Sequence, residues 1–508
     1  MARNITSRLI ITGNLVSITP IHVGGLGGNA QTDMALAING KGEYYIPGTS
    51  LAGALREWMG SDSKLANALW GYQDVKSDRG HASFVLVEDA RIQAKAEIRD
   101  GVGIDRYYGT AAEHFKFDRA ILPRGSRIPL EITIEQNPHE DWEISKAEWF
   151  NLLEALQNKE IRFGAAKTRG LGLVKLEDLK ILDQNLSTRQ GILDTLRGKG
   201  TGTTLGALSN QSVTSNHPQL HIEIQWQPVS PVMVKAEADG IAVDILPLVS
   251  ANGSNLSFVI PGSSIKGSLR SQTERIMRTV LNKQTDNTGN SRKDFQNQLE
   301  QVDLIRHIFG AAAKTVNGEQ VGNIGALSAD DCYASRDISE QQWLAVTSAQ
   351  NESGLRTSLD AANLNSTQQA FHVAIDRWTG GAADGFLYSN LEPMGVSWQP
   401  IHLTINFRRI KEQSDYLPAI ALILLTLRDL SMGKIPLGYG TNRGMGAIKV
   451  NKIQLSGSGF DKLLSDLSLP KELQNGDITG LGQEVLQNLT EAWQTKIASI
   501  QLQQEVNS

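Results

Sequence analysis

Four groups of residues that could contact a phosphodiester backbone occur in the same order in the two halves of the sequence. Each half contains a loop that ends in aspartate, a helix start followed by arginine, an Ile-Asp-Arg segment and an Arg-Gly-x-Gly loop. Arginine pairs with phosphate, and glycine lets backbone N–H groups approach a phosphate closely. Neither glycine loop fits a dinucleotide fingerprint or a Walker A motif, so each alone is weak evidence. Together the four groups predict a surface that contacts a nucleic-acid backbone.

The helix start is the clearest repeat, an eleven-residue stretch whose copies begin at Ile46 and Ile260. The copies read Ile-Pro-Gly-Thr-Ser-Leu-Ala-Gly-Ala-Leu-Arg and Ile-Pro-Gly-Ser-Ser-Ile-Lys-Gly-Ser-Leu-Arg. This pattern predicts a strand end, a tight turn and a helix, capped by Thr49 or Ser50 in the first copy and by Ser264 in the second. The first amides of such a helix can bind an anion. The alternative is an ordinary helix start that binds no ligand.

The spacing of the other repeats shows that the two halves are related. Asp33 recurs 211 residues later as Asp244, and Arg106 recurs 271 residues later as Arg377. Repetition over this length indicates a duplicated domain, because the repeats of solenoid proteins are much shorter. The larger second offset indicates insertions in the second half, which we assign to two polar segments expected to be at the surface or disordered, residues 282–297 and 351–369.

The pattern of strands, loops and composition divides the chain into four parts. We predict a first domain at 1–185, a linker rich in Gly, Ser and Thr at 186–218, a second domain with insertions at 219–455, and a C-terminal extension at 456–508. Apolar residues at helical spacing predict an amphipathic helix over 479–506. We expect this helix to pack on its own domain, and docking to a neighbouring subunit is the alternative.

Composition excludes several classes of protein. With 508 residues, 40% hydrophobic and 20% charged, the chain is typical of soluble globular proteins with two to four domains. No apolar run is long enough to cross a membrane, and the N-terminus lacks the apolar region of a signal peptide, so we expect a cytoplasmic protein. The single cysteine, Cys332, excludes internal disulfides and cysteine-based zinc clusters. The net charge of −5 argues against a nonspecific nucleic-acid binder, so any such site must be local.

The order of these motifs resembles that of the RAMP superfamily, in particular the backbone subunits of type III CRISPR effector complexes. Two tandem copies cover most of residues 5 to 455, as in the fused subunits of the subtype III-D variant. The resemblance implies an α+β fold with two modified RNA-recognition (RRM), ferredoxin-like domains, each with a thumb-like insertion. It implies a ribonucleoprotein in antiviral defence, with a guide CRISPR RNA, a complementary target RNA, other RAMP subunits and a large polymerase-like subunit as partners, and no membrane.

The resemblance also implies that each domain cuts the target RNA once, as a nuclease with a catalytic aspartate in the loop before the Ile-Pro-Gly strand. The matching residues are Asp33 and Asp244, which would also be the ligands of Mg²⁺ or another divalent cation. Asp239 is the competing residue in the second half. The alternative for Asp33 or Asp244 is an Asx turn that caps its own loop. One carboxylate cannot hold two metal ions, so a plausible mechanism has one Mg²⁺ shared with RNA phosphates while the thumb aligns a 2′-OH for attack on its own phosphate.

The resemblance and the motifs together yield a set of candidate RNA contacts. His22, Gly24 and Gly25 match the His-x-Gly-Gly pattern of the family, although His22 could instead pack the loop, and the second half has Met233 and Lys235 in place of the first two. Arg106 and Arg377 could bind RNA or pair with the preceding aspartate. The other candidates, from the helix starts and the glycine loops, are Ser50, Arg56, Lys167, Arg169, Gly170, Ser264, Lys266, Arg270, Asn442, Arg443 and Gly444.

Two other functions are compatible with the same residues. The chain could be a scaffold that binds guide RNA without cleaving anything, or a guide-RNA-processing nuclease, which would favour histidine-centred cleavage without a metal ion. The sequence contains no His-Asp nuclease pair, no Gly-Gly-Asp-Asp polymerase motif and no His-Glu-x-x-His. The RNA-guided endoribonuclease is therefore the function that the sequence favours.

Overall fold

The computed structural model places the chain in two compact units, which we describe separately. The first contains residues 1–98, 118–167 and 171–215, and the second contains 99–117, 168–170 and 216–508. The structure describes residues 4–25, 28, 32–60, 63–74, 77, 79–203, 218–236, 239–285, 287–288, 291–299, 302–316, 319–458 and 469–507.

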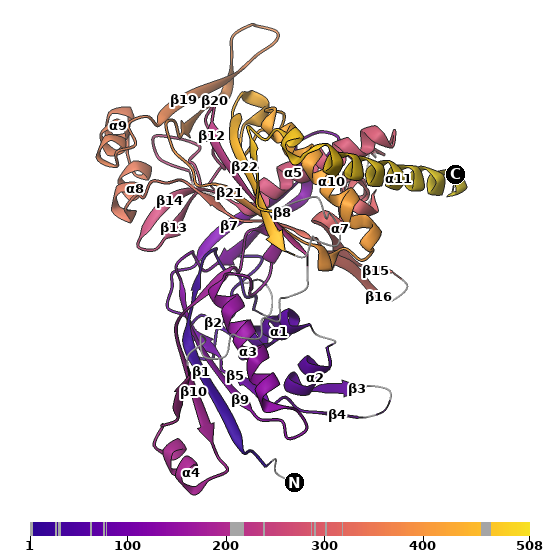
Figure 1. The fold of residues 1–508 in the computed structure, drawn as a ribbon. Helices are drawn as coiled ribbons and strands as arrows, with labels where there is room; N and C mark the ends of the chain where they lie inside the picture. The colour runs from indigo at the N-terminus through magenta and orange to yellow at the C-terminus, as the bar shows by residue number, and fades with distance from the viewer. Residues whose placement is uncertain are drawn as a thin grey trace. The chain divides into compact units, whose positions relative to one another are not determined.

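The first unit is built on a five-stranded antiparallel sheet in the order β11-β10-β1-β9-β5, with β11 (Thr201–Thr203) and β5 (Val85–Val87) at the edges. Strands β10, β1, β9 and β5 are labelled in Figure 1. The central strand β1 (Ser7–Ser17) pairs with β10 (Val174–Asn185) and β9 (Arg127–Glu135). Every second residue of β9 from Ile128 is buried, which is the period expected of a strand with one face on the core. Helices α1 (Gly48–Met59) and α3 (Trp142–Gln157) contact this sheet and each other.

The second unit repeats this sheet in the order β17-β21-β12-β22-β23. Its strands are β12 (Gln219–Pro228), β17 (Leu327–Ala329), β21 (Ile401–Asn406), β22 (Ile448–Ser458) and β23 (Lys471–Gln474). The segment β22-β12-β21-β17 corresponds to β10-β1-β9-β5, and both central strands carry a bulge in their pairing with the last strand of the repeat. The shared strand order confirms the predicted duplication and the α+β class.

The other helices and strands connect or extend the two sheets. They are β2 (Tyr45–Ile46), α2 (Lys64–Trp70), β3 (Tyr72–Asp74), β4 (Arg79–His81), β6 (Ala90–Arg91), β7 (Glu97–Ile104), β8 (Ala111–Ile121), α4 (Arg189–Leu196), β13 (Val249–Asn252), β14 (Asn255–Ile260), α5 (Gly262–Val280), α6 (Ser291–Gln298), α7 (Asp303–Phe309), β15 (Gly310–Val316), β16 (Glu319–Ile324), β18 (Cys332–Tyr333), α8 (Glu340–Thr347), α9 (Glu352–Ala361), β19 (Gln368–Ile375), β20 (Ala382–Glu392), α10 (Tyr416–Ser431) and α11 (Gln483–Asn507).

Several segments that looked irregular in the sequence are ordered in the structure. The segment predicted as a linker contains α4 and also β11, which pairs with β10, while residues 204–217 lie outside the described part of the chain. The polar insertions contain α6 and α9, whose apolar residues Phe295, Leu355 and Leu359 are buried. A few buried apolar side chains are thus enough to fold these polar segments onto the domain.

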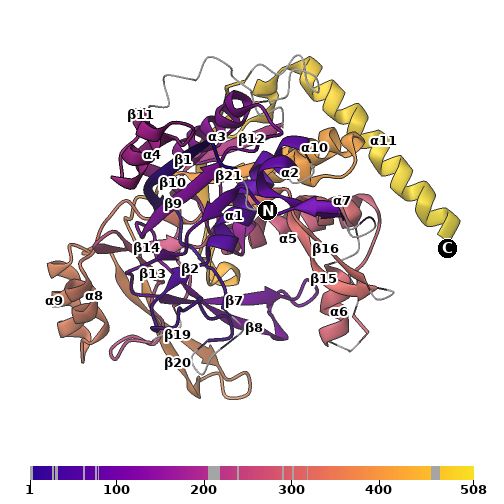
Figure 2. The ribbon, with the colours of Figure 1, turned by 90° about the horizontal axis from the view of Figure 1, so that it is seen from below.

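The C-terminal helix α11 packs on its own unit, as expected. Val485, Leu489 and Ile497 are buried in the main apolar core of this unit, and α11 contacts α10. An ion pair of 2.5 Å between Lys496 Nζ and the buried Asp415 Oδ1 fixes the helix further. The last turns of α11 extend beyond α10 (Figure 2). Among the described residues, no helix combines the length and the apolar character needed to span a bilayer.

The second unit also holds the single cysteine of the chain. Cys332 is 1% exposed, its Sγ lies 3.1 Å from the carbonyl oxygen of Gln399, and burial raises its pKa to about 12. A thiol with this pKa is almost entirely protonated at neutral pH, and thiols react as thiolates. Cys332 is therefore a chemically inert core residue.

The hairpin β7–β8 lies within the sequence of the first predicted domain, but most of it belongs to the second unit. The Ile-Asp-Arg segment of the first half lies at the tip of this pair of antiparallel strands. Arg99 forms an ion pair with Asp331 and donates to Ser250 Oγ at 2.8 Å. The Phe115 ring packs against Phe295 of α6, with ring centroids 4.5 Å apart. The insertion that carries α6 therefore supports this hairpin.

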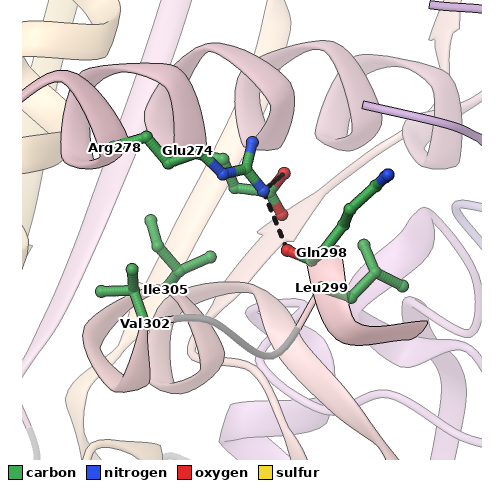
Figure 3. A pocket seen from close by; sticks show the side chains of 6 residues that line it. All are labelled: Glu274, Arg278, Gln298, Leu299, Val302 and Ile305. Carbon is green, nitrogen blue, oxygen red and sulfur yellow. Dashed lines mark hydrogen bonds and ion pairs between the residues drawn. The ribbon is translucent and has the colours of Figure 1, made fainter. Parts of the chain in front are cut away.

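Glu274 of α5 joins the hairpin tip to the helix through three arginines. Its carboxylate lies 2.6 Å from Arg106 Nε, 2.7 Å from Arg270 Nε and 3.7 Å from Arg278 Nη2. Figure 3 shows Arg278 directed toward Glu274 and toward the carbonyl oxygen of Gln298, to which it donates at 2.9 Å. The Glu274 side chain is only 4% exposed, so one buried carboxylate pairs with three guanidinium groups.

We predict that Glu274→Ala destabilises the second unit by about 3 kcal/mol, because removing one partner of a buried ion pair leaves the other charges uncompensated. The measurement is the midpoint of urea unfolding. Glu352→Ala is the matched control, since Glu352 pairs with Arg356 at 3.8 Å in an exposed helix pair that contributes little. Equal midpoints for the two variants would contradict the prediction.

Candidate nucleic-acid interface

The two repeated helix starts are packed so tightly that only glycine fits their first position. A Cβ atom on Gly48 would lie 2.0 Å from the carbonyl oxygen of Val87, and one on Gly262 would lie 2.1 Å from that of Ala329. Both distances are far inside van der Waals contact. The Ile-Pro-Gly motif therefore lets each helix begin directly against the neighbouring chain segment.

The first amide of each helix is bound by an aspartate that follows this segment. Gly48 N donates to Asp89 Oδ1 at 2.7 Å, and Gly262 N donates to Asp331 Oδ1 at 2.8 Å. The predicted caps are wrong, because neither helix has a side-chain cap at its N-cap position, which is proline in both. An RNA phosphate at the helix start would have to compete with a carboxylate of the protein itself. In the sequence, each of these aspartates lies two residues after the residue whose carbonyl oxygen faces the glycine, since Asp89 follows Val87 and Asp331 follows Ala329. This spacing was the only signal that could have identified them.

The polar residues inside the repeated motif are largely held by the protein itself. Ser50 is exposed, and Ser264 is half-buried. Arg56 donates to Asn67 Oδ1 at 2.8 Å, and Arg270 donates to the carbonyl oxygens of Leu299 and Gly310 in addition to its pair with Glu274. These two arginines are thus used in packing contacts.

Lys266 differs from the usual lysine that binds phosphate, because it is buried. Its exposed fraction is 6%, and Nζ donates to the carbonyl oxygen of Leu327 at 2.7 Å. The pKa of Lys266 is lowered well below its usual value, first by burial and then by the charges of Arg270, Arg169 and Arg409. The first half has Ala52 at this position. Contact between Lys266 and RNA would require the ammonium group to leave this environment.

We predict that Lys266 makes the stability of the second unit rise with pH. In the range between the lowered pKa and 10.5 the unfolded chain binds the proton of this lysine more tightly, so deprotonation favours the folded state. Lys266→Met should remove this part of the pH dependence, measured as the urea midpoint from neutral pH up to 10.5. Lys434→Met is the control, because Lys434 is about half exposed and should leave the profile of the unaltered protein. A Lys266→Met profile parallel to that of the unaltered protein would contradict the prediction.

The two candidate catalytic aspartates occupy the same place in the two halves. Asp33 and Asp244 are exposed, and each directly precedes a residue that pairs in parallel with a hairpin strand, Met34 with Arg119 and Ile245 with Asn390. The carboxylates accept hydrogen bonds from the amides of Asp118 on β8 and Ser389 on β20, at 3.0 and 2.7 Å. Asp244 is therefore the structural counterpart of Asp33, whereas the exposed Asp239 lies five residues earlier in the loop.

These contacts differ from the Asx turn that was the alternative for both aspartates. In the described residues their carboxylates accept from a hairpin strand, whereas Asp105 and Asp376 at the hairpin tips do cap their own turns. Asp105 Oδ1 accepts from the amides of Tyr107 and Tyr108, and Asp376 Oδ1 from those of Trp378 and Thr379. The latter bonds lower the pKa of Asp376.

The arginines that follow these turn aspartates have different environments. The Arg106 side chain is 9% exposed and pairs with Glu274 of α5. The expected alternative was a pair with the preceding aspartate, and the observed partner is Glu274 instead. Arg377 is exposed at the tip of the β19–β20 hairpin. Of the two residues, Arg377 is the one whose position is open to RNA.

His22 and the glycines after it build the loop that carries Asp33. His22 is 4% exposed, its Nδ1 lies 2.7 Å from the carbonyl oxygen of Ala120, and burial lowers its pKa, so it is a packing residue. Gly24 pairs with Leu36, and Gly25 N donates to Ala35 O at 3.0 Å. The second half repeats both contacts, Lys235 with Pro247 and Ala236 N with Leu246 O at 2.9 Å. The loop geometry therefore does not depend on the His-x-Gly-Gly residues.

The first Arg-Gly-x-Gly loop is packed against other parts of the chain. Lys167 pairs with Glu57 at 2.8 Å, while Arg169 is exposed. Gly170 has a φ of +92°, and a Cβ atom there would lie 3.1 Å from the Cα of Gly262, so this glycine is required by close approach to α5.

The second Arg-Gly-x-Gly loop lies at the surface. Asn442, Arg443 and Gly444 are exposed, and the Arg443 guanidinium lies over the Tyr439 and Tyr388 rings, at 5.0 and 5.6 Å from the ring centroids. Tyr388 directly precedes Ser389, which contacts Asp244. Sequence reasoning missed both tyrosines, because the first half has Phe117 and Ala165 at the corresponding positions and the repeat gave no signal.

Each aspartate site fits a hydrated Mg²⁺ only if a substrate supplies some of the metal ligands. Among the described residues, no three His, Cys, Asp or Glu side chains converge in a way that would hold a metal ion. Mg²⁺ is commonly bound by one or two carboxylates together with waters and substrate phosphates. An exposed carboxylate in each half meets that requirement only when RNA supplies the remaining ligands.

Comparison with known proteins identifies one family. Residues 14–175 and 245–449 match the sequence model of the RAMP superfamily. The first matched region contains Asp33, and the second begins one residue after Asp244. No curated protein matches the chain.

Proposed function

We propose that this chain, which belongs to the RAMP superfamily as a tandem two-domain protein, is a guide-RNA-binding backbone subunit that cleaves target RNA once per domain. Membership of this family supports RNA binding within a CRISPR effector complex. This proposal rests on one observation: Asp33 and Asp244 lie in corresponding loops, and the carboxylate of each accepts a hydrogen bond from the corresponding hairpin strand. Kinship with the fused backbone subunits of subtype III-D is part of the proposal. Base pairing with the guide would read the target sequence, while the protein contacts the backbone.

The role assigned to each aspartate is to hold a divalent cation beside the scissile phosphate, because a carboxylate alone would repel the negative phosphate. A bound Mg²⁺ would supply charge neutralisation at the phosphate oxygens. The 2′ oxygen of the nucleotide attacks its own phosphorus as the 2′-OH proton passes to solvent water. The bond from phosphorus to the 5′ oxygen of the next nucleotide breaks, and that oxygen takes a proton from water. The products are a 2′,3′-cyclic phosphate and a 5′-OH end. The role of the protein is to hold the strand in the geometry that this attack requires.

The β19–β20 hairpin is suited to hold a strand in this way. The outer part of this hairpin carries exposed apolar side chains, whereas its base is buried in the unit, and Trp378 at the tip is 96% exposed. Aromatic side chains such as those of Trp378 and Phe386 stack against unpaired bases without sequence preference. The exposed apolar residues of the hairpin are Phe371, Val373, Ile375, Trp378, Phe386 and Leu387.

We predict that Asp33→Ala and Asp244→Ala each abolish one of two distinct cuts in a guide-matched RNA. The lost cut should slow by roughly 100-fold or more, the size expected when a positioned charge is removed from a reaction centre. The assay uses the assembled complex with an end-labelled target, and the double variant should lose both cuts while still binding RNA.

Asp239→Ala is the matched control, because this exposed aspartate lies in the same loop as Asp244 without contacting Ser389. It should leave both cuts intact. If both single variants cut as the unaltered protein does, the subunit is a scaffold. Cutting that persists in EDTA would instead favour a guide-processing activity without a metal ion.

The attacking group can be tested on the RNA itself. A 2′-deoxyribose placed at one cut nucleotide should abolish that cut and leave the other unchanged, because the nucleophile is missing at one site only. The products are measured by mass spectrometry, which distinguishes a cyclic phosphate from a 3′-OH end. Cleavage at the deoxyribose would rule out attack by the 2′-OH.

A further inference from the structure

Asp118 and Ser389 occupy the same position on the second strand of the two hairpins. They are 271 residues apart, the same offset that relates Asp105 to Asp376 at the hairpin tips. Each is followed by the residue that pairs in parallel with the loop, Arg119 in the first half and Asn390 in the second. Their side chains differ in charge and size, so the sequence repeat did not identify them.

In the first half, Asp118 and the loop bind each other in both directions. Asp118 Oδ1 accepts from Asp33 N and from Thr32 Oγ1, both at 2.6 Å, and Asp118 N donates to Asp33 Oδ2 at 3.0 Å. The loop backbone and the Asp33 side chain are therefore fixed by the same residue. Thr32 is buried although Asp33 is exposed, so the loop is anchored directly next to the exposed carboxylate.

In the second half, a hydroxyl takes over the role of that carboxylate. Asp244 N donates to Ser389 Oγ at 3.3 Å, while Ser389 Oγ and Ser389 N donate to Asp244 Oδ2 at 3.0 and 2.7 Å. Ser389 is 3% exposed. The geometry is thus retained although the chemical group has changed from an acceptor to a donor and acceptor.

In each half, one carboxylate oxygen of the aspartate accepts the hydrogen bonds that come from the hairpin. Oδ2 accepts from the hairpin in both halves, and Oδ1 takes no part in the contacts with Asp118 or Ser389. An exposed aspartate normally samples several rotamers, and fixing one in advance lowers the entropic cost of reaching a reactive geometry. In each half, the hydrogen bonds between the loop and Asp118 or Ser389, which we call the frame, therefore fix one carboxylate oxygen of the aspartate.

From this geometry we infer that Asp118 and Ser389 are positioning residues, each of which orients the aspartate of its own half for the cut made there. The inference rests on the proposed cleavage activity. It also states that the charge of Asp118 is not required, because a neutral serine performs the same role in the second half. In the second half, Ser389 lies on β20, so the hairpin proposed to hold the RNA also carries the residue that contacts Asp244.

The test compares Asp118→Ala with Asp118→Asn in the assembled complex, with guide RNA and an end-labelled complementary RNA. Loss of an outer-shell partner of this kind typically costs 10- to 100-fold, so Asp118→Ala should slow the first cut by about that factor. Asp118→Asn keeps an oxygen that can accept from Asp33 N and should retain the first cut. The second cut, made in the other half, is the internal control and should not change in either variant.

The matched experiment in the second half uses Ser389→Ala and Ser389→Thr. Ser389→Ala keeps the amide that donates to Asp244, so we expect a smaller slowing of the second cut than Asp118→Ala causes in the first. Ser389→Thr restores the hydroxyl and should rescue the cut. Hydrogen–deuterium exchange of the peptide that contains Asp33 supplies a readout independent of cleavage, and it should become faster in Asp118→Ala but not in Asp118→Asn.

Three results would overturn the inference. The first is an Asp118→Ala protein with an unchanged first cut and unchanged exchange. The second is an Asp118→Asn protein as slow as Asp118→Ala, which would show that the charge acts directly. The third is an equal loss of both cuts in Asp118→Ala, which would show general damage to the fold. If Asp33→Ala retains its cut, the proposed cleavage fails separately, and the exchange experiment still decides whether Asp118 orders the loop.

Discussion

The close approach of each repeated helix to the neighbouring strand segment constrains the rest of both domains. Gly48 and Gly262 lack a Cβ atom in a space where one would overlap a carbonyl oxygen, and the amide of each is bound by Asp89 or Asp331. These contacts fix where the helix begins relative to the sheet. They also place a carboxylate at the positive end of the helix dipole, where a bound anion would otherwise be stabilised. The motif is thus explained by packing, and the site proposed for RNA chemistry lies elsewhere, where the aspartate loops meet the hairpins.

The two halves keep the same frame and use it differently. Both loops pair with their hairpin strand at corresponding residues, and both hairpin tips are turned by an aspartate that accepts two amides. The first hairpin is held by Glu274 and Phe295 in the second unit, whereas the second exposes Trp378 and Phe386. The insertion in the second half, with α6, explains this difference, because the first half has no corresponding segment. Duplication thus preserved the backbone geometry while the surroundings diverged.

The sequence predicted the features that depend on spacing along the chain. The duplication, the equivalence of Asp33 with Asp244 and the C-terminal helix follow from repeats or from periodicity, and the α+β class follows from the family resemblance of the motifs. Contacts between distant segments were not predictable in this way. The cap on Gly48 comes from Asp89, 41 residues away, and the frame around Asp33 comes from Asp118, 85 residues away. Local propensity favoured Thr49 or Ser50 as caps, because it takes no account of a carboxylate from a distant segment of the chain. Lys266 looked like a surface cation, because nothing in its neighbours reveals that its position in α5 faces the core.

The environment of Cys332 has a practical consequence for measuring how the hairpins move. This thiol is enclosed and remains protonated at neutral pH, so alkylating dyes and spin labels have no natural target in the chain. A cysteine introduced at an exposed tip can therefore carry a fluorophore without removal of the native residue from the core. Distances between probes on the two tips could then be followed as RNA is added, in a protein whose packing has not been altered.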